Sequence, residues 1–427
     1  MTEQAQARRT TGHRRIRQAG IAAAAVGLSG VIVSGTQGSA FAAAHDPASS
    51  AAHEVGTAAY DLGDTAFKDP GTGIPMELTG VVHYPKDVRD GRRPMIVQLH
   101  GMWNPCTSQD GVWPCPAGSA ALPSYRGYDY LGEELARQGY VVVSISANAV
   151  NANLLGGEGA AARAALVDKH LSLWKSLSET GKGDLAGKFT DPAGKRSDVD
   201  FTNSIDFGRV GTMGHSQGGR AVVQHASEGH RDRWPSGVDV KAVLALAPAY
   251  PFDAQPDEDG TDAFNPDAAV VNSAFAVVSG TCDGAVGTTG ATFLDDARKA
   301  GNTAGMHDIT VHGANHNYFN TQWSPSSRQA HAEDDAMKTG PGGRSLPTGH
   351  CRPHPQHDVN QKTYRQLSET GQRKIATTYI SAFFQRYVSG EKKFDAILSG
   401  KEHPLSDIGQ VDAHTRPAGR SPAPAAK

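Results

Sequence analysis

The sequence predicts an α/β protein with a mostly parallel, doubly wound sheet and helices on both faces. Short apolar runs of strand length alternate along the chain with stretches whose apolar residues have helical spacing. This alternation is typical of βαβ units. A second observation is an apolar run, 210–213, that leads through a glycine-flanked turn into a helix-compatible run.

The expected elements follow in chain order. An antiparallel pair at 54–67 and 77–85 opens the fold, and buried strands are expected at 95–99, 140–145, 210–213, 242–246, 275–278 and 309–311. Helices are expected at 130–136, 160–178, 219–226 and 375–387, the last of them amphipathic and suited to cover the sheet. Polar stretches at 181–204 and 253–266 are expected to be surface loops, with a calcium loop as the alternative for the acidic second one.

The sequence divides the chain into three segments. Residues 1–44 combine five arginines, a weakly apolar stretch and a small-residue end, which indicates a signal peptide cleaved after Ala42 or Ala44. The paired arginines are compatible with the twin-arginine route. We expect one α/β domain over 45–399 and a disordered tail, rich in Pro and Ala, over 400–427.

The turn Gly214-His215-Ser216-Gln217-Gly218 is the strongest motif in the chain. Its strand–turn–helix context is that of a nucleophile elbow, in which a strained turn exposes the serine hydroxyl. The glycines leave room where strand and helix come too close for side chains. The motif predicts Ser216 as a catalytic nucleophile.

A serine nucleophile needs an acid and a base, which follow it in that order in this type of site. Asp283 comes after the strand 275–278 and His316 after the strand 309–311, so both are expected on loops near Ser216. Asp253 remains the alternative acid and His312 the alternative base.

The oxyanion of such a reaction needs backbone donors. A His-Gly pair, His100-Gly101, follows the apolar strand 95–99 as it does in the oxyanion loop of lipases and esterases. We therefore predict the N–H groups of Gln217 and Met102 as the oxyanion hole.

Taken together, the strand-His-Gly loop, Gly-His-Ser-Gln-Gly, Gly-Thr-Cys-Asp and Gly-Ala-Asn-His resemble secreted bacterial α/β-hydrolases of the dienelactone hydrolase, cutinase and polyester-hydrolase group. The resemblance covers roughly residues 54 to 390. It implies the α/β-hydrolase fold and a serine carboxylester hydrolase that needs no cofactor and no metal. Dienelactone hydrolases use a cysteine nucleophile, so the serine here favours the esterases and cutinases. The expected substrate is an ester, small or polymeric.

Other functions remain as alternatives. A serine peptidase or amidase uses the same triad, and a non-catalytic binding protein can retain the same fold. Trp103 and Tyr318 lie within a few residues of the predicted machinery and are the candidate substrate-binding residues.

Charge excludes some partners. The chain has net charge −3, and removal of a segment with five arginines and one glutamate leaves about −7. An acidic protein gives no electrostatic case for nucleic acid. No stretch after the signal is long and apolar enough to span a membrane, and we expect a secreted monomer.

Four cysteines in a secreted chain predict two disulfides. Cys106 and Cys115 flank a short loop and are expected to pair, which leaves Cys282 for Cys351. A zinc site at Cys351 with the neighbouring histidines 350, 354 and 357 is the less favoured alternative, because its spacing matches no common zinc pattern.

Overall fold

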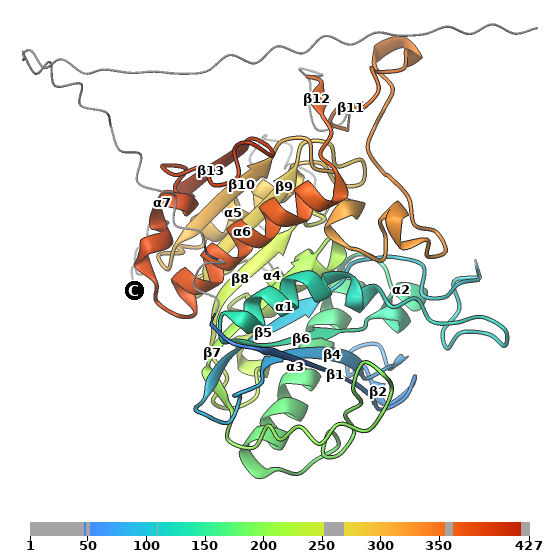
Figure 1. The fold of residues 1–427 in the computed structure, drawn as a ribbon, viewed down its shortest axis with the longest axis vertical. Coiled ribbons are helices and arrows are strands. Elements are labelled where there is room, and N and C mark those ends of the chain that lie inside the picture. Colours follow the sequence, from blue (N-terminus) through green and yellow to red (C-terminus); the bar gives the residue numbers. More distant parts are fainter. Residues whose placement is uncertain (1–46, 48–51, 109, 252–268, 355–361, 420–427) are drawn as a thin grey trace, which may run out of the picture. The chain divides into compact units, whose positions relative to one another are not determined.

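Strands and helices alternate through most of the chain in the computed structural model, which describes residues 47, 52–108, 110–251, 269–354 and 362–419 (Figure 1). The described residues belong to one unit, 43–427. The predicted signal peptide and the acidic stretch 253–266 lie outside the described residues.

A large sheet forms the centre of the described part of the chain. Its strands are β1 (Val55–Asp61), β4 (Thr79–Pro85), β5 (Arg93–Leu99), β6 (Val141–Ile145), β7 (Ile205–His215), β8 (Val240–Leu246), β9 (Ala274–Gly280), β10 (Met306–Val311) and β13 (Val411–Arg416). Among the described residues the sheet has nine strands in the order β1-β4-β6-β5-β7-β8-β9-β10-β13. The pairs between β6 and β10 are all parallel, whereas β1, β4 and β13 join antiparallel. The predicted mostly parallel sheet is confirmed.

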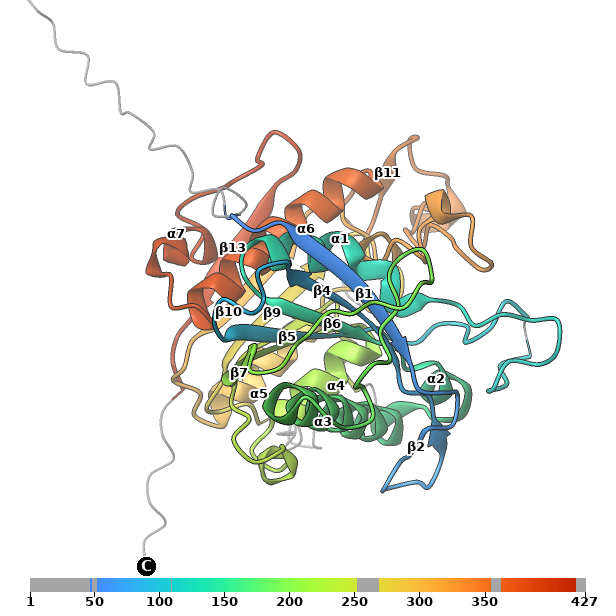
Figure 2. The same cartoon turned by 60° about the horizontal axis from the view of Figure 1, so that its bottom comes forward.

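Helices lie on both faces of this sheet. They are α1 (Asp129–Arg137), α2 (Asn148–Asn153), α3 (Gly156–Thr180), α4 (Gln217–Ala226), α5 (Thr292–Lys299), α6 (Glu369–Tyr387) and α7 (Asp395–Leu398). Figure 2 shows α3, α4 and α5 on one side of the strands and α1, α6 and α7 on the other. The predicted α/β character, with helices on both faces, is therefore confirmed.

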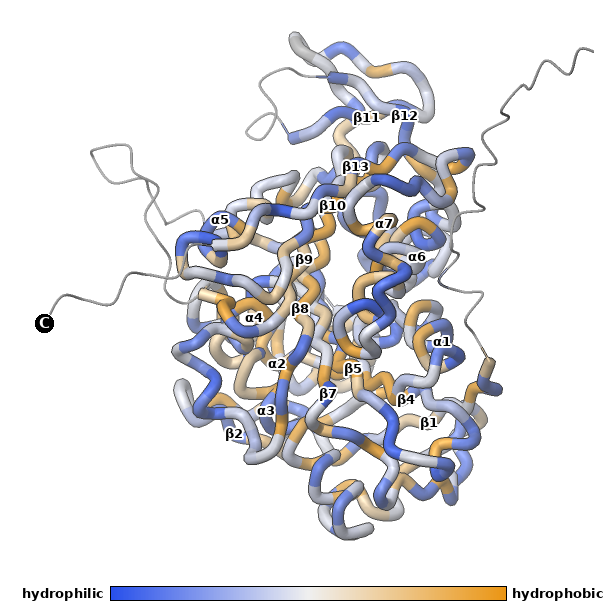
Figure 3. The backbone as a smooth tube through the Cα atoms, turned by 90° about the vertical axis from the view of Figure 1, so that its left-hand side faces the viewer, coloured by the Kyte–Doolittle hydropathy of each residue, from blue (hydrophilic) through white to orange (hydrophobic). Residues whose placement is uncertain are grey.

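Two hydrophobic cores result from this layering. Side chains alternate along each strand, so Ile96 packs in the core under α1 and α6, while its neighbour Val97 packs in the core under α3 and α4. The hydrophobic colouring of β8 and β9 against mostly hydrophilic outer loops follows the same division (Figure 3). Strands buried on both faces explain the continuous apolar runs in the sequence.

The opening antiparallel pair is also confirmed. β1 pairs with β4 along its whole length, from Val55 opposite Pro85 to Asp61 opposite Thr79. Between them in the chain, β2 (Phe67–Lys68) and β3 (Pro75–Met76) pair as a separate two-stranded sheet. A second two-stranded sheet, β11 (His350–Cys351) with β12 (Tyr364–Arg365), lies far along the chain.

The C-terminal segment differs from the prediction. Residues 400–419 are described, and 411–416 form β13, which pairs antiparallel with β10. The prediction of disorder is wrong for these residues, because Val411 and Ala413 alternate toward the core within a segment of polar composition. Residues 420–427 lie outside the described residues.

Within the described residues, the longest helices are too polar to cross a bilayer.

Candidate active site

Ser216 occupies a sharp turn between β7 and α4. Its backbone has φ 58° and ψ −124°, a conformation that costs a non-glycine residue about 1–3 kcal/mol. The side chain is 6% exposed, and the residue precedes the first turn of α4 as its N-cap. This is the geometry that the sequence motif predicts for a nucleophile elbow.

The two glycines of the motif are required by close backbone approach. A Cβ at Gly214 would lie 1.9 Å from the carbonyl oxygen of Gly218. A Cβ at Gly218 would lie 2.6 Å from the carbonyl oxygens of both Leu99 and His100. The end of β5 is thereby pressed against the start of α4, which brings the His100-Gly101 loop to the serine.

The predicted acid and base lie together. His316 Nδ1 is 2.7 Å from Asp283 Oδ2, and both side chains are buried. The other oxygen, Asp283 Oδ1, accepts backbone N–H groups of Ala285, Val286 and Gly287 at 2.7–3.2 Å. Because β9 and β10 are parallel neighbours, their carboxyl ends place the two loops at one edge of the sheet. The Asp283–His316 pair can therefore hold the imidazole with Nε2 available.

The base also lies beside the elbow. The His316 ring is 4.5 Å, centroid to centroid, from the ring of His215, the residue before the serine. Among the described residues, no hydrogen bond joins the Ser216 hydroxyl to His316. Catalytic hydrogen bonds of this kind often form only when substrate is bound.

Charge favours a protonated His316. Burial alone would lower its pKa, but the Asp283 charge and hydrogen bond, together with the charge of Asp335, raise it above the ordinary value. His215 has the opposite environment, since burial first and then the neighbours His316 and His100 hold its pKa well below the usual range. His215 therefore stays neutral and adds no repulsion when His316 takes up a proton.

The two residues predicted to supply the oxyanion donors belong to segments that adjoin the serine. A Cβ at Gly101 would lie 2.4 Å from Ser216 Cβ and 3.1 Å from its Oγ, so the loop that carries Met102 touches the nucleophile. Gln217 begins α4, where backbone N–H groups have no partner within the helix. In the part of the chain that the structure describes, the N–H groups of Met102 and Gln217 donate no hydrogen bond. Both donors are thus available to a ligand.

Asp335 is a site residue that the sequence reasoning missed. Its Oδ2 accepts the N–H groups of Gly284 at 2.9 Å and His316 at 3.1 Å, and its Oδ1 accepts that of Asn317 at 2.8 Å. It therefore fastens the acid loop to the base loop. Burial, followed by the charge of Asp283, raises the pKa of the Asp335 carboxyl to about 6. Only its place in an acidic run, Glu333-Asp334-Asp335, marked it in the sequence.

The alternative base, His312, is held by another acid. His312 Nε2 lies 2.8 Å from Asp412 Oδ2 on the edge strand β13, so this imidazole is held by a different carboxylate. Asp253 lies outside the described residues.

Trp103, a predicted substrate-binding residue, lies in an aromatic stack that reaches the base. Its ring stacks on Trp323 at 4.8 Å and 15°. Trp323 in turn lies 4.9 Å from the His215 ring and 6.3 Å from the His316 ring. Trp103 is half-buried and Trp323 fully buried, so the exposed part of this stack is Trp103.

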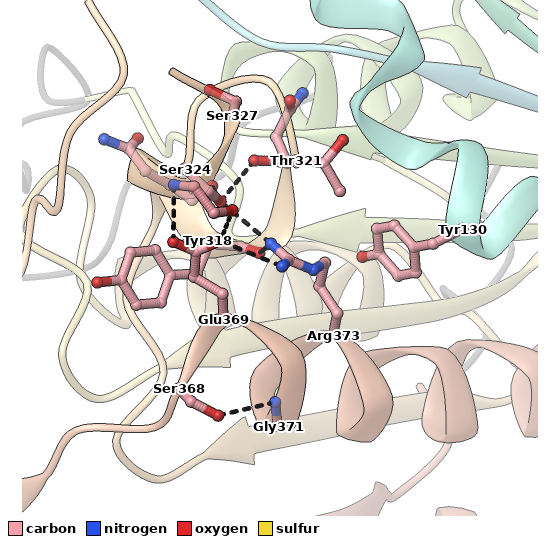
Figure 4. Close-up of polar contacts among 12 residues, drawn as sticks. Tyr130, Tyr318, Thr321, Ser324, Ser327, Ser368, Glu369, Gly371 and Arg373 are labelled. Atoms are coloured by element: carbon pink, nitrogen blue, oxygen red, sulfur yellow. Dashed lines mark hydrogen bonds and ion pairs between the residues drawn. The ribbon is translucent and has the colours of Figure 1, made fainter. Parts of the chain in front are cut away.

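Tyr318, the second predicted substrate-binding residue, is largely buried in the segment after His316. Burial and the nearby Asp334 carboxylate raise the pKa of its phenol. Arg373 of α6 donates to the Tyr318 carbonyl and to Ser324 Oγ, both at 3.2 Å, and pairs with Glu369 (Figure 4). This network ties the base loop to α6.

The two predicted disulfides are confirmed. Cys106 pairs with Cys115 and Cys282 with Cys351. The second bond joins the residue before Asp283 to β11, so it anchors the acid loop to the same segment, 324–354, that supplies Asp335.

Comparison with protein-family models and with curated proteins finds no match to this chain. The assignment of function therefore depends on the geometry of the site itself.

Proposed function

We propose that the chain is a secreted serine hydrolase with the α/β-hydrolase fold, which cleaves carboxylic esters through an acyl-enzyme. Ser216 is the nucleophile, His316 the base and Asp283 the acid. The observation that carries the proposal is the strained backbone of Ser216 at the start of α4, beside a buried imidazole–carboxylate pair.

The mechanism follows from the positions of these groups. Ser216 Oγ attacks the ester carbonyl while His316 Nε2 accepts its proton, and Asp283 stabilises the imidazolium through Nδ1. The free N–H groups of Gln217 and Met102 are the donors for the tetrahedral oxyanion. His316 then protonates the leaving alcohol and next activates the water that releases the acid. No step requires a cofactor.

The energy stored at position 216 supports catalysis over a structural role. A turn needs no serine at positive φ, and glycine would adopt this conformation without strain. Strained non-glycine residues cluster at active sites, where the strain belongs to the mechanism. Two disulfides are in keeping with an oxidising compartment and hence with secretion. We include export through the predicted signal peptide, by the twin-arginine route, in the proposal.

Hydrolysis of p-nitrophenyl acetate, butyrate, octanoate and palmitate tests the proposal. We expect turnover of at least one ester by the wild type and a loss of about 10⁴-fold or more in kcat for Ser216→Ala. Ser204→Ala is the matched control, because Ser204 is also buried and precedes the same strand β7. That variant should retain its activity.

The outcomes separate the alternatives. Activity that persists in Ser216→Ala would overturn the assignment of the nucleophile. If no ester is cleaved but a fluorophosphonate labels Ser216, the peptidase or amidase alternative gains support. Absence of labelling as well would favour a non-catalytic binding protein.

A further inference from the structure

Three side chains of metal-ligand type meet between α3 and α4, outside the proposed active site. Asp168 comes from α3, His225 from the last turn of α4, and His230 from the loop that follows. Figure 2 shows α3 and α4 packed side by side. His225 lies about 13 Å from Ser216 along the axis of α4. The cluster is therefore independent of the triad.

The ligand atoms of the cluster lie close together. His225 Nε2 is 3.1 Å from Asp168 Oδ1, and His230 Nε2 is 2.7 Å from Asp168 Oδ2. All three ligand atoms lie within 4.8 Å of one another. Tetrahedral zinc with bonds of about 2.0–2.2 Å needs ligand atoms about 3.3 Å apart. Small side-chain shifts therefore suffice to admit an ion.

A cavity reaches the carboxylate of the cluster. Asp168 lines a hollow of about 510 Å³ together with Phe67, Ser172 and Arg233. His225 is fully buried and His230 is 5% exposed, so a metal would reach the carboxylate from this side. The hollow has room for a water molecule as a further ligand.

We propose that Asp168, His225 and His230 bind one Zn²⁺ ion, with water as the fourth ligand. Imidazole nitrogen favours zinc over magnesium or calcium. The two histidines have the His-x₄-His spacing found in zinc sites. The ion links α3 to α4 and so stabilises one face of the sheet. The sequence did not indicate this site because Asp168 is far from the two histidines along the chain.

The expected affinity is moderate. His225 Nδ1 is buried and has no hydrogen-bond partner within the described residues. Zinc-bound histidines normally donate this second N–H, and lack of the partner weakens binding about 10–100-fold. We therefore expect a Kd of about 1 µM rather than nanomolar binding.

Titration of ZnCl₂ into the EDTA-treated full chain at about pH 7, followed by calorimetry, tests the proposal. We expect one ion per chain and a rise in Tm of about 3 °C or more at saturation. Co²⁺ in its place should give the visible absorption of a tetrahedral site. His230→Ala and Asp168→Asn should each weaken binding by about 10-fold or more and abolish the Tm rise.

His53→Ala is the matched control. His53 also pairs with a carboxylate, Asp87, at 2.9 Å, but none of the other described histidines bonds to that pair. This variant should bind zinc as the wild type does. No stoichiometric binding to the wild type, or equal binding by His230→Ala and Asp168→Asn, would overturn the proposal. Because Asp168→Asn keeps the size of the side chain, it decides the matter if His230→Ala fails to fold.

Discussion

At the residue scale, two carboxylates act on His316 in different ways. Asp283 contacts the ring nitrogen, whereas Asp335 accepts the backbone N–H of the same residue. Both negative charges raise the pKa of His316. Since a protonated base cannot accept the serine proton, the charge at position 335 affects the pH range of the proposed reaction.

The variant Asp335→Asn tests this. Loss of the charge lowers the pKa of His316, so the acid limb of kcat/KM against pH should move to lower pH. The effect applies above about pH 6, where Asp335 is ionised. One acceptor oxygen is also lost, and we expect kcat near neutral pH to fall about 10-fold. The measurement is the pH profile with p-nitrophenyl butyrate.

Asp334→Asn provides the comparison. Asp334 bonds to Asn315, Gln366 and Lys338 but does not contact the backbone of His316. Its replacement should leave the acid limb in place. If the acid limb moves by the same amount in both variants, the cause is a less rigid loop and not the loss of the Asp335 charge.

At the element scale, β13 closes one edge of the sheet. It pairs with β10, and β10 leads into the loop that carries His316. Asp412 of β13 also holds His312. The last strand therefore supports the base loop from outside.

A chain truncated after residue 399 should lose this support. Removal of β13 leaves the edge of β10 unpaired and exposes Val311 and Ile309 of the core. Exposed edges of this kind promote association between chains. We expect aggregation in size-exclusion chromatography and loss of activity. A chain truncated after Gly419, which keeps β13, is the control and should behave as the full chain does. If the 1–399 chain is monomeric and active, β13 is not needed to support the base loop.

At the scale of the whole molecule, the two disulfides close loops of very different length. Cys282–Cys351 spans 69 residues and Cys106–Cys115 spans 9. The chain-entropy model gives about 4 and about 2.6 kcal/mol of stabilisation, respectively. The longer bond also holds the acid loop.

Paired serine replacements should reveal this difference. Cys282→Ser with Cys351→Ser should lower both the free energy of unfolding and kcat. Cys106→Ser with Cys115→Ser should also lower the free energy of unfolding. This loss should be smaller than that of the first double variant by about 1–2 kcal/mol. Denaturant unfolding and ester turnover measure the two effects. Equal kcat in both double variants would show that the acid loop keeps its position without the bond.

The sequence predicted those parts of the molecule in which local chemistry determines structure. Buried parallel strands appear as apolar runs. Gly214 and Gly218 mark positions where neighbouring backbone segments come too close for any other residue. β13 was missed because only Val411 and Ala413 face the core in a polar segment. Asp335 was missed because its partners are backbone groups distant in sequence, which residue types do not reveal.

The positive φ at position 216 also limits which nucleophilic side chains a mutation can place in the turn. β-Branched residues are strongly disfavoured at positive φ, so threonine should distort the turn, whereas cysteine has the same branching as serine and should fit. We expect Ser216→Cys to fold with wild-type Tm and to be alkylated by iodoacetamide, and Ser216→Thr to lose about 1–3 kcal/mol of stability. Among simple nucleophiles, we thus expect the fold to accept a thiol in place of the hydroxyl and to disfavour a secondary alcohol.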